Sequence, residues 1–316
     1  MKRNLLIVLL LAAAVAIAAL PWWGSDVLVQ FGINALLLAA LAQSWNILGG
    51  YTGYASFGNS VFYGLGAYGV AVAMVQFHWS FAAGMALGGA LAVVFALLLG
   101  VPVLRLKGHY FAIATLGISQ VMGAVVANLP IAGSNIGLVL PLINNNVLFY
   151  ELSFALVVAV TLVVWWIARS RFGYGLIAIR ENEEAAAAMG INTTRFKVAA
   201  YALSGLFAAL AGGIHAYWIT FLDPNGAFDL TLNVKMIIMA VFGGPGTVLG
   251  PVAGALLLSA ISEVLAAKVT GVAALFFGTV IVAAVVFMPR GMADVLRRWP
   301  QQGWRYFGLN MRKNRL

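Results

Sequence analysis

The chain has 316 residues, of which 63% are hydrophobic and only 9% are charged, and its formal net charge is +9. A mean hydropathy of +0.98 excludes a globule covered by polar side chains in water and predicts an all-α polytopic membrane protein instead. The absence of cysteine excludes disulfides and thiolate metal sites, and the basic residues flank apolar runs, which indicates membrane topology rather than nucleic-acid binding.

Ten apolar segments are candidates for membrane-spanning helices, since a helix needs about 20 residues to cross about 30 Å of hydrocarbon. In chain order they are Leu5–Leu20, Val27–Leu48, Val61–Phe77, Phe81–Leu104, His109–Asn128, Leu152–Ala168, Val198–Ile219, Leu232–Phe242, Pro251–Ala267 and Val272–Met288. Glycine-rich stretches interrupt the series: GGYTGYASFGNS follows the second segment and GGPGTVLGP follows the eighth. We expect one transmembrane domain over residues 1–289, and a tail of residues 290–316 whose basic and aromatic side chains suit contact with anionic membrane lipid.

The basic residues test the number of spans. With a cytoplasmic N-terminus, 16 of the 18 lysines and arginines fall on the cytoplasmic side, and only Lys235 and Lys268 fall on the outer side. Positively charged residues accumulate in cytoplasmic loops. The pattern therefore predicts an even number of spans with both the N-terminus and the C-terminus in the cytoplasm.

Two segments have a second interpretation. Residues 1–20 combine a basic start, an apolar run and Ala16-Ile17-Ala18, as a signal peptide also does, although the following Trp22–Trp23 pair favours a retained anchor. Leu232–Phe242 measures only about 16 Å as a helix, roughly half a membrane. It either begins earlier, near Phe228, or is a broken helix, which is tolerated at membrane depth only where it is buried or lines a polar path.

The sequence holds no recognisable catalytic apparatus. No GxxxxGK[ST], GxSxG or HExxH motif occurs, and the three histidines show no ligand spacing. The carboxylates Glu151, Glu263, Asp223 and Asp229 fall near the outer ends of spans or in outer loops, so a proton or sodium relay lacks its parts. We expect a transport protein that is not an enzyme and binds no metal or cofactor, and that takes energy for uphill transport from another subunit.

Three of the nine acidic residues lie within four positions of the segment FGYGLIAIRENEEAAAAMGINTTRFK, residues 172–197, which the charge pattern places in the cytoplasm. Strong helix formers over residues 181–189, with acidic residues in the first turn, predict a short helix. Gly190 can end that helix, and Asn192 or Thr193 can cap the next one. The short helix is either a solvated linker or a surface for a partner, because four alanines allow close approach and glutamates form a polar rim.

Glu184-Ala185-Ala186 followed by Gly190 matches the E-A-A-x-x-x-G loop of ABC importer permeases. Four longer stretches resemble the permeases of branched-chain amino acid importers, particularly the larger of their two permease subunits: RFGYGLIAIRENEEAAAAMGINTTRFKVAAYALSG, GGYTGYASFGNSVFYGLGAY, RLKGHYFAIATLG and FGGPGTVLGPVAGALL. The resemblance covers most of the chain. It implies that residues 172–197 dock on an ATP-hydrolysing subunit, and that Glu181, Glu184, Ala185, Ala186 and Gly190 couple the two proteins.

The same resemblance implies the rest of the assembly. This chain would form a heterodimer with a second permease subunit and work with two ATP-binding subunits, which use ATP and Mg²⁺, and with a periplasmic substrate-binding protein. It would lie in the bacterial inner membrane and pass branched-chain (aliphatic) amino acids; close relatives handle urea or short-chain amides. A stand-alone secondary carrier or a purely structural membrane protein is the alternative from another class.

Polar side chains inside the spans are candidates for a substrate path, since they are costly in lipid unless they face the bundle interior. The candidates are Asn34, Ser44, Ser56, Asn59, Ser119 and Gln120. Interrupted helices recur at transporter binding sites, so we expect the glycine-rich breaks at residues 49–60 and 243–250 near the path. Alternatively, the polar groups only bind helices together and the glycines only permit close packing.

Overall fold

A computed structural model describes residues 16–268, together with 279 and 292. Most of the first apolar segment, all but residue 279 of the tenth segment Val272–Met288, and all but residue 292 of the tail of residues 290–316 lie outside the described residues. The described chain is a bundle of helices joined by short loops, with one pair of two-residue strands.

The first half of the bundle contains α2 (Leu20–Trp23), α3 (Asp26–Trp45), the π-helix η1 (Asn46–Gly50), α4 (Asn59–Val75), α5 (Phe81–Val103), α6 (His109–Ala127), the 3₁₀ turns η2 (Pro130–Ala132) and η3 (Ser134–Ile136), and β1 (Leu138–Val139). The second half contains α7 (Asn146–Arg169), α8 (Arg171–Glu181), α9 (Glu183–Ala188), α10 (Thr193–Ile219), β2 (Phe221–Leu222), α11 (Pro224–Ala227), α12 (Leu230–Gly243) and α13 (Gly250–Lys268).

Six helical stretches among the described residues are long and apolar enough to cross a membrane. They are Asp26–Gly50, Phe81–Val103, His109–Ala127, Asn146–Arg169, Thr193–Ile219 and Pro224–Gly243. The helix α4 and the Gly250–Leu265 part of α13 are apolar but shorter. The all-α polytopic architecture is therefore confirmed, whereas the expected count of about ten spans is not.

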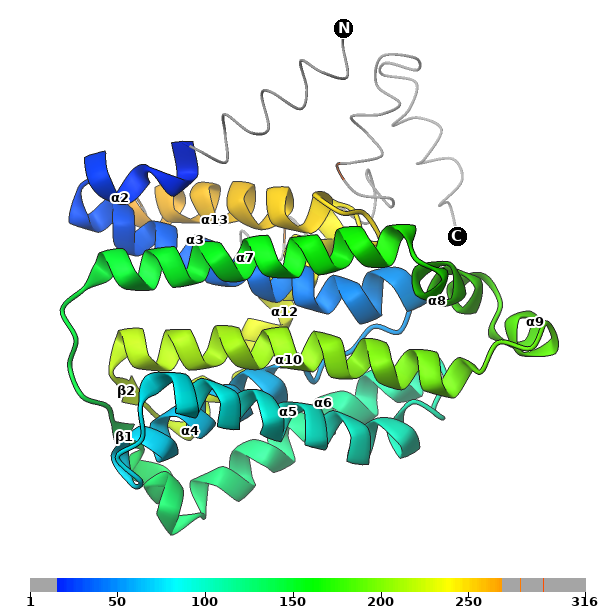
Figure 1. Cartoon of the computed structure of the whole chain (residues 1–316), viewed down its shortest axis with the longest axis horizontal. Helices are drawn as coiled ribbons and strands as arrows, with labels where there is room; N and C mark the ends of the chain where they lie inside the picture. Colours follow the sequence, from blue (N-terminus) through cyan, green and yellow to red (C-terminus); the bar gives the residue numbers. More distant parts are fainter. Residues whose placement is uncertain (1–15, 269–278, 280–291, 293–316) are drawn as a thin grey trace, which may run out of the picture.

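The helix α10 lies at the centre of the bundle, between α3 and α7 on one side and α4 and α5 on the other (Figure 1). Glycines bring α4 and α10 into backbone contact: a Cβ added to Gly66 would lie 1.9 Å from the carbonyl oxygen of Ala209, and one added to Gly212 would lie 2.0 Å from that of Tyr63. No side chain fits in either gap. Gly66 in the VFYGLGAYG stretch of α4 and Gly212 of α10 therefore pack the two helices together.

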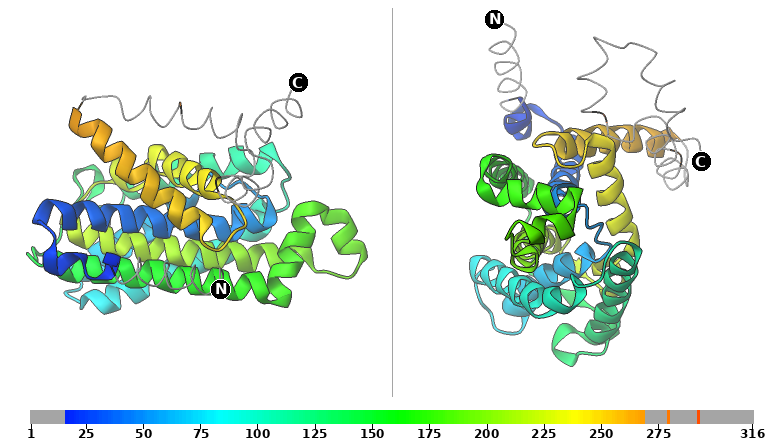
Figure 2. Two further views of the ribbon diagram at one scale, coloured as in Figure 1. Left: turned by 90° about the horizontal axis from the view of Figure 1, so that it is seen from above. Right: turned by 90° about the vertical axis from the view of Figure 1, so that its right-hand side faces the viewer.

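The bundle has two chemically different ends. The helices α8 and α9 project from one end, as the left view of Figure 2 and the right-hand side of Figure 1 show. The loops and helix ends there carry Arg105, Lys107, Arg169, Arg171, Arg180, Arg195 and Lys197. The antiparallel pair of β1 and β2, which aligns Leu138 with Leu222, marks the opposite end. This segregation is the one that cytoplasmic basic loops require, although the orientation of the termini stays a prediction.

The eighth apolar segment combines both of its expected alternatives. The helix α12 begins at Leu230, earlier than expected, because Asp229 caps it by accepting a hydrogen bond from the N–H of Thr231 at 2.8 Å. The helix ends at Gly243, since Gly244 has a φ of +123° that a side chain disfavours. Its 14 residues extend about 21 Å, and α11 precedes it as a separate turn. The segment is therefore both longer than expected and interrupted.

Candidate functional site

The loop between α7 and α10 folds as two short helices rather than one. The expected helix over residues 181–189 is wrong at its start, because Glu181 closes α8 and α9 begins at Glu183. Asn182 causes the division: its backbone is extended, and its Oδ1 accepts a hydrogen bond from the N–H of Ala185 at 3.0 Å. Asparagine is a favoured cap because its side chain satisfies a backbone N–H that the helix leaves free.

Gly190 ends α9 as expected, with a φ of +88°. Its N–H donates to the carbonyl of Ala187 at 2.9 Å, and the N–H of Ile191 donates to that of Ala186 at 3.1 Å, which is the paired pattern of a Schellman motif. Glycine is favoured there because it has no Cβ. Asn192, one of the two expected caps, then caps α10.

The tip of this loop exposes most of the residues that the sequence predicts for coupling. Four of the five are exposed: Glu181, Glu184, Ala185 and Gly190. The fifth, Ala186, is buried on the inner side of α9. Sequence reasoning did not single out Met189, whose side chain is 84% exposed next to them. The outward surface of α9 is therefore small, acid-rimmed and partly apolar.

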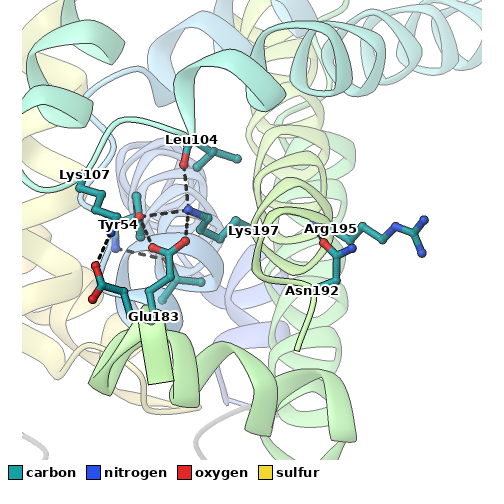
Figure 3. A network of polar contacts seen from close by, with 9 residues as sticks. Tyr54, Leu104, Lys107, Glu183, Asn192, Arg195 and Lys197 are labelled. Atoms are coloured by element: carbon teal, nitrogen blue, oxygen red, sulfur yellow. Dashed lines mark hydrogen bonds and ion pairs between the residues drawn. The ribbon is translucent and has the colours of Figure 1, made fainter. Parts of the chain in front are cut away.

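The buried side chain of Lys197 connects α9 to the rest of the bundle (Figure 3). Lys197 Nζ lies 2.6 Å from Glu183 Oε1, and it donates to the carbonyl of Leu104 at 2.7 Å and to the hydroxyl of Tyr54 at 3.0 Å. The Tyr54 hydroxyl in turn donates to Glu183 Oε2. Only 4% of the Lys197 side chain and 19% of the Glu183 side chain are exposed. We call Lys197, Glu183, Tyr54 and the carbonyl of Leu104 the anchor network. It joins α9 to α10, to the end of α5 and to the segment before α4.

The electrostatics keep the Glu183 carboxylate charged. Burial by itself raises the pKa of this carboxyl, but the hydrogen bonds from Lys197 and Tyr54 and the charge of Lys197 together outweigh burial and hold the pKa below its ordinary value. A second ion pair nearby, between Lys107 and Glu184 at 3.0 Å, is exposed by 63% and 84%. Solvent screens an exposed pair, so it contributes little. The two pairs therefore differ mainly in burial, and the buried pair is also the shorter one, at 2.6 Å against 3.0 Å.

The two glycine-rich breaks lie against each other, on the side chains of α3 and η1. Asn46 Nδ2 donates to the carbonyl of Thr247 at 2.9 Å, and Asn46 Oδ1 accepts from the N–H of Gly246 at 2.7 Å. Gln43 Nε2 donates to the carbonyl of Val248 at 2.7 Å. Side chains of α3 and η1 thus satisfy backbone groups that the break at residues 243–250 leaves outside helices, as buried backbone requires. The π-helix places Asn46 there, and π-helical turns are frequent at functional sites.

Arg180 extends from α8 to this junction. Its Nη1 donates to the carbonyl of Gly50 at 3.2 Å, and a Cβ added to Gly246 would lie 2.9 Å from the same nitrogen. Its Nη2 pairs with Glu181 Oε1 at 3.0 Å. The projecting loop therefore contacts both breaks through one guanidinium group.

Two of the path candidates belong to buried polar clusters in the bundle interior. Ser119 of α6 shares a hydrogen bond with Ser60 of α4, and Asn233 of α12 donates to the same Ser60 hydroxyl at 2.7 Å. Asn59 donates to the hydroxyl of Ser204 at 3.1 Å. Its Oδ1 is buried without a hydrogen-bond partner among the described residues. These uncharged groups converge from four helices.

The other four candidates are not brought together. The hydroxyl of Ser44 donates to the carbonyl of Leu41 in its own helix, and that of Ser56 accepts from the N–H of Gly58. Asn34 and Gln120 are exposed and line two separate pockets, one between α3, α12 and α13 and one beside α6, α11 and α12. Asn34 and Ser44, which the helical spacing places on one face, therefore lie in different environments.

Sequence reasoning missed four residues that organise the site: Lys197, Tyr54, Asn46 and Asn233. Lys197 is one of the 16 basic residues that the charge pattern places in the cytoplasm, and Asn46 lies in the second apolar segment but is not among the path candidates. A lysine at the start of a span usually extends its ammonium toward water. Nothing in the local sequence distinguishes such an exposed lysine from one that, like Lys197, is buried by a neighbouring loop.

Comparison with known proteins gives a family. The model of the family described as branched-chain amino acid transport system / permease component matches residues 25–285. The high-affinity branched-chain amino acid transport system permease protein LivM of Escherichia coli K12 is 26% identical over 328 residues, which cover 94% of this chain and 76% of the relative. The LivM protein of Salmonella typhimurium LT2 has the same identity and coverage.

A more local similarity points to another solute. The autoinducer 2 import system permease protein LsrC of Salmonella typhi is 36% identical over 118 residues, but these cover only 35% of this chain and 33% of the relative. No solved structure matches significantly.

Proposed function

The chain belongs to the family of branched-chain amino acid transport permeases, and on that premise we propose that it is the transmembrane permease subunit of an ATP-driven ABC importer. Its bundle forms part of the translocation path for branched-chain (aliphatic) amino acids, which a periplasmic binding protein delivers. It is a non-catalytic subunit of the inner membrane, with both termini in the cytoplasm.

One observation supports the coupling role: the exposed helix α9 is attached to the bundle by the buried ion pair of Glu183 and Lys197. The outward face of α9 is open to a partner, while Glu183 on its inner side meets Lys197, which is almost fully buried. A buried ion pair broken on one side leaves an uncompensated charge, which costs about 3–5 kcal/mol. Because separating α9 from α10 would break this buried pair, a displacement of α9 moves α10 with it.

The mechanism follows from what the anchor network touches. Closure of the ATP-binding subunits displaces α9 as a rigid body. Lys197 transmits the movement to α10 and to the end of α5. Arg180 transmits it to the glycine-rich breaks at Gly50 and Gly246. Short irregular segments between rigid helices are where backbone rotation is absorbed in hinge movements. The bundle thereby alternates between outward and inward openings.

The remaining partners follow from chemistry that the chain lacks. No phosphate-binding Walker loop exists in the sequence, so ATP and Mg²⁺ belong to two separate ATP-binding subunits, and this chain binds no cofactor. A second permease subunit completes the heterodimer. Membrane lipid contacts the apolar outer surface, and nucleic acid has no role.

Cross-linking tests the docking surface, because the chain has no cysteine of its own. Ala185→Cys should cross-link to the ATP-binding subunit in the assembled importer, whereas Ile136→Cys, which is also exposed but lies at the opposite end, should not. The exposed Glu184→Lys should leave the complex in the membrane but reduce uptake per ATP hydrolysed. Equal cross-linking at both positions, or unchanged coupling, would contradict the proposal.

A second candidate substrate is urea or a short-chain amide, and one observation favours it. The buried cluster of Ser60, Ser119 and Asn233 is uncharged, and its hydroxyl and amide groups, which bond to one another, are of the kind that a neutral amide pairs with. Competition by urea against leucine uptake distinguishes the two solutes. Uptake by the chain alone, without ATP, would instead indicate a secondary carrier.

A further inference from the structure

Building on the proposed function, we propose that the pocket between α3, α12 and α13 is a binding site for an α-amino acid with an apolar side chain. Lys235 faces the solute's carboxylate and Glu263 faces its ammonium group. The pocket lies apart from the uncharged cluster of Ser60, Ser119 and Asn233.

The composition of the pocket suits a zwitterion with an apolar side chain. Its cavity volume of about 170 Å³ is below the roughly 300–1,000 Å³ of drug-sized sites, which limits the solute to a small molecule such as a single amino acid. The polar lining residues are Asn34, Lys235, Ser259, Ser262 and Glu263, and the apolar ones are Phe31, Ala35, Leu38 and Met239. One cation, one anion and a mainly hydrophobic remainder are the groups that such a solute requires.

The spacing of these residues shows that three helix faces converge. On α3, Phe31, Asn34 and Leu38 recur at intervals of three and four, which places them on one side of the helix. Lys235 and Met239 are four apart on α12. The pocket is therefore built from regular helix faces, which hold side chains more rigidly than loops do.

The depth of the polar groups argues for a function. Asn34 lies eight residues, about 12 Å, from the start of α3, and Lys235 lies about 8 Å from the start of α12. Glu263 lies five residues, about 8 Å, from the end of α13, so both charges lie in the outer part of their spans. Charged side chains within a span are costly unless they face protein or a water-filled cavity, and they mark solute pathways. A lysine and a glutamate on one pocket therefore indicate a path rather than a lipid-facing surface.

Ser259 supplies an independent observation. Its side chain is 6% exposed and lines the pocket, and its hydroxyl has no hydrogen-bond partner in the part of the chain that the structure describes. A buried hydroxyl without a hydrogen-bond partner is destabilising. A bound carboxylate or ammonium group would satisfy it.

The two charges select among solutes. An amino acid meets Lys235 and Glu263 with opposite charges, whereas urea or an amide meets neither charge with its complement. A leucine analogue that lacks the amino group, 4-methylpentanoate, would bring an uncompensated anion close to Glu263. The pocket thus discriminates against the neutral solutes of the second candidate function.

Protection of single cysteines tests the site directly, and the cysteine-free chain provides a clean background. Asn34→Cys and Ser262→Cys are made in the assembled importer and labelled with a methanethiosulfonate reagent. Leucine should slow labelling of both, whereas 4-methylpentanoate should not. Gln30→Cys is the matched control: it lies one turn earlier on α3 but lines a different pocket, so leucine should leave its labelling unchanged.

Uptake measurements give the second test. Lys235→Met and Glu263→Gln should each raise the KM for leucine by at least about tenfold, because each leaves one charge of the solute unpaired. Stimulation of ATP hydrolysis by the binding protein should persist. Unprotected cysteines together with an unchanged KM, in an importer that still takes up leucine, would overturn the site but leave the proposed function intact. An importer that hydrolyses ATP without any leucine uptake would contradict the proposed substrate instead.

Discussion

The ammonium nitrogen of Lys197 lies 2.6 Å from Glu183 Oε1, and it joins the longest helix of the described bundle to the first residue of its most exposed one. The contact is shielded from solvent, so salt does not screen it as it screens surface pairs. Such a contact can carry force between the projecting loop and the spans.

Replacement of Lys197 by Met should uncouple transport. The variant leaves the Glu183 carboxylate buried and unpaired, which should cost about 3 kcal/mol of stability in the loop. Reconstituted importer should keep ATP hydrolysis while uptake per ATP falls several-fold. Lys107→Met is the matched control, because Lys107 makes a direct but exposed pair with Glu184, which is worth at most about 1 kcal/mol. Equal effects of the two variants would rule out a special role for the buried anchor.

Gly190 should tolerate Asn better than Ala or Val. Nothing lies within 4 Å of a Cβ built at Gly190, so a clash is not the obstacle, whereas its φ of +88° disfavours other residues. A left-handed residue with a side chain costs about 1–2 kcal/mol, and Asn less. Uptake per ATP should therefore decrease in the order Gly, Asn, Ala, Val. A decrease that follows side-chain volume instead, with Ala better than Asn, would contradict this explanation.

Acid should weaken the anchor network. The pKa of the Glu183 carboxyl is held below its ordinary value of about 4.5, so the pair adds stability that is present above that value and is lost as the pH falls through the lower folded pKa. The difference in melting temperature between wild type and Glu183→Gln should stay constant above about pH 6 and disappear below the folded pKa. Thermal unfolding in detergent at a series of pH values measures this difference. A difference in melting temperature that grows on acidification would contradict the lowered pKa of Glu183.

Two glycines should respond oppositely to the same substitution. Gly66→Ala forces a methyl group against the backbone of Ala209 and should destabilise the bundle by about 1–3 kcal/mol or more. Gly117→Ala meets nothing within 4 Å inside α6 and should stabilise the helix by up to about 1 kcal/mol. Melting temperatures in detergent compare them, and similar values would mean that α4 and α10 do not pack as closely as described.

Asn59 separates a path role from a packing role. Asn59→Leu removes the hydrogen bond to Ser204 and the buried Oδ1, so we expect normal assembly with reduced leucine uptake. Ser44→Ala is its control, since the Ser44 hydroxyl bonds only to its own helix. Unchanged uptake in Asn59→Leu would assign Asn59 to helix packing.

Local interactions explain what could be read from the chain alone. The apolar runs, the stop at Gly243 and the turn at Gly190 depend on contacts within one or two helical turns, and the structure retains them. The division of the loop at Asn182 was not predicted, because strong helix formers on both sides favour one continuous helix over an N-cap at Asn182.

The sequence by itself determined the class of protein, the alternation of apolar and basic segments, and the family motifs, since hydropathy and backbone preference act residue by residue. Tertiary structure alone decided that Asn46 meets Gly246, 200 positions away, that Lys197 is buried on Glu183, and that Asn34 and Ser44 lie apart. The reason is physical: helical spacing fixes which side chains share a face, but only packing against other helices decides whether that face meets lipid, protein or a pocket.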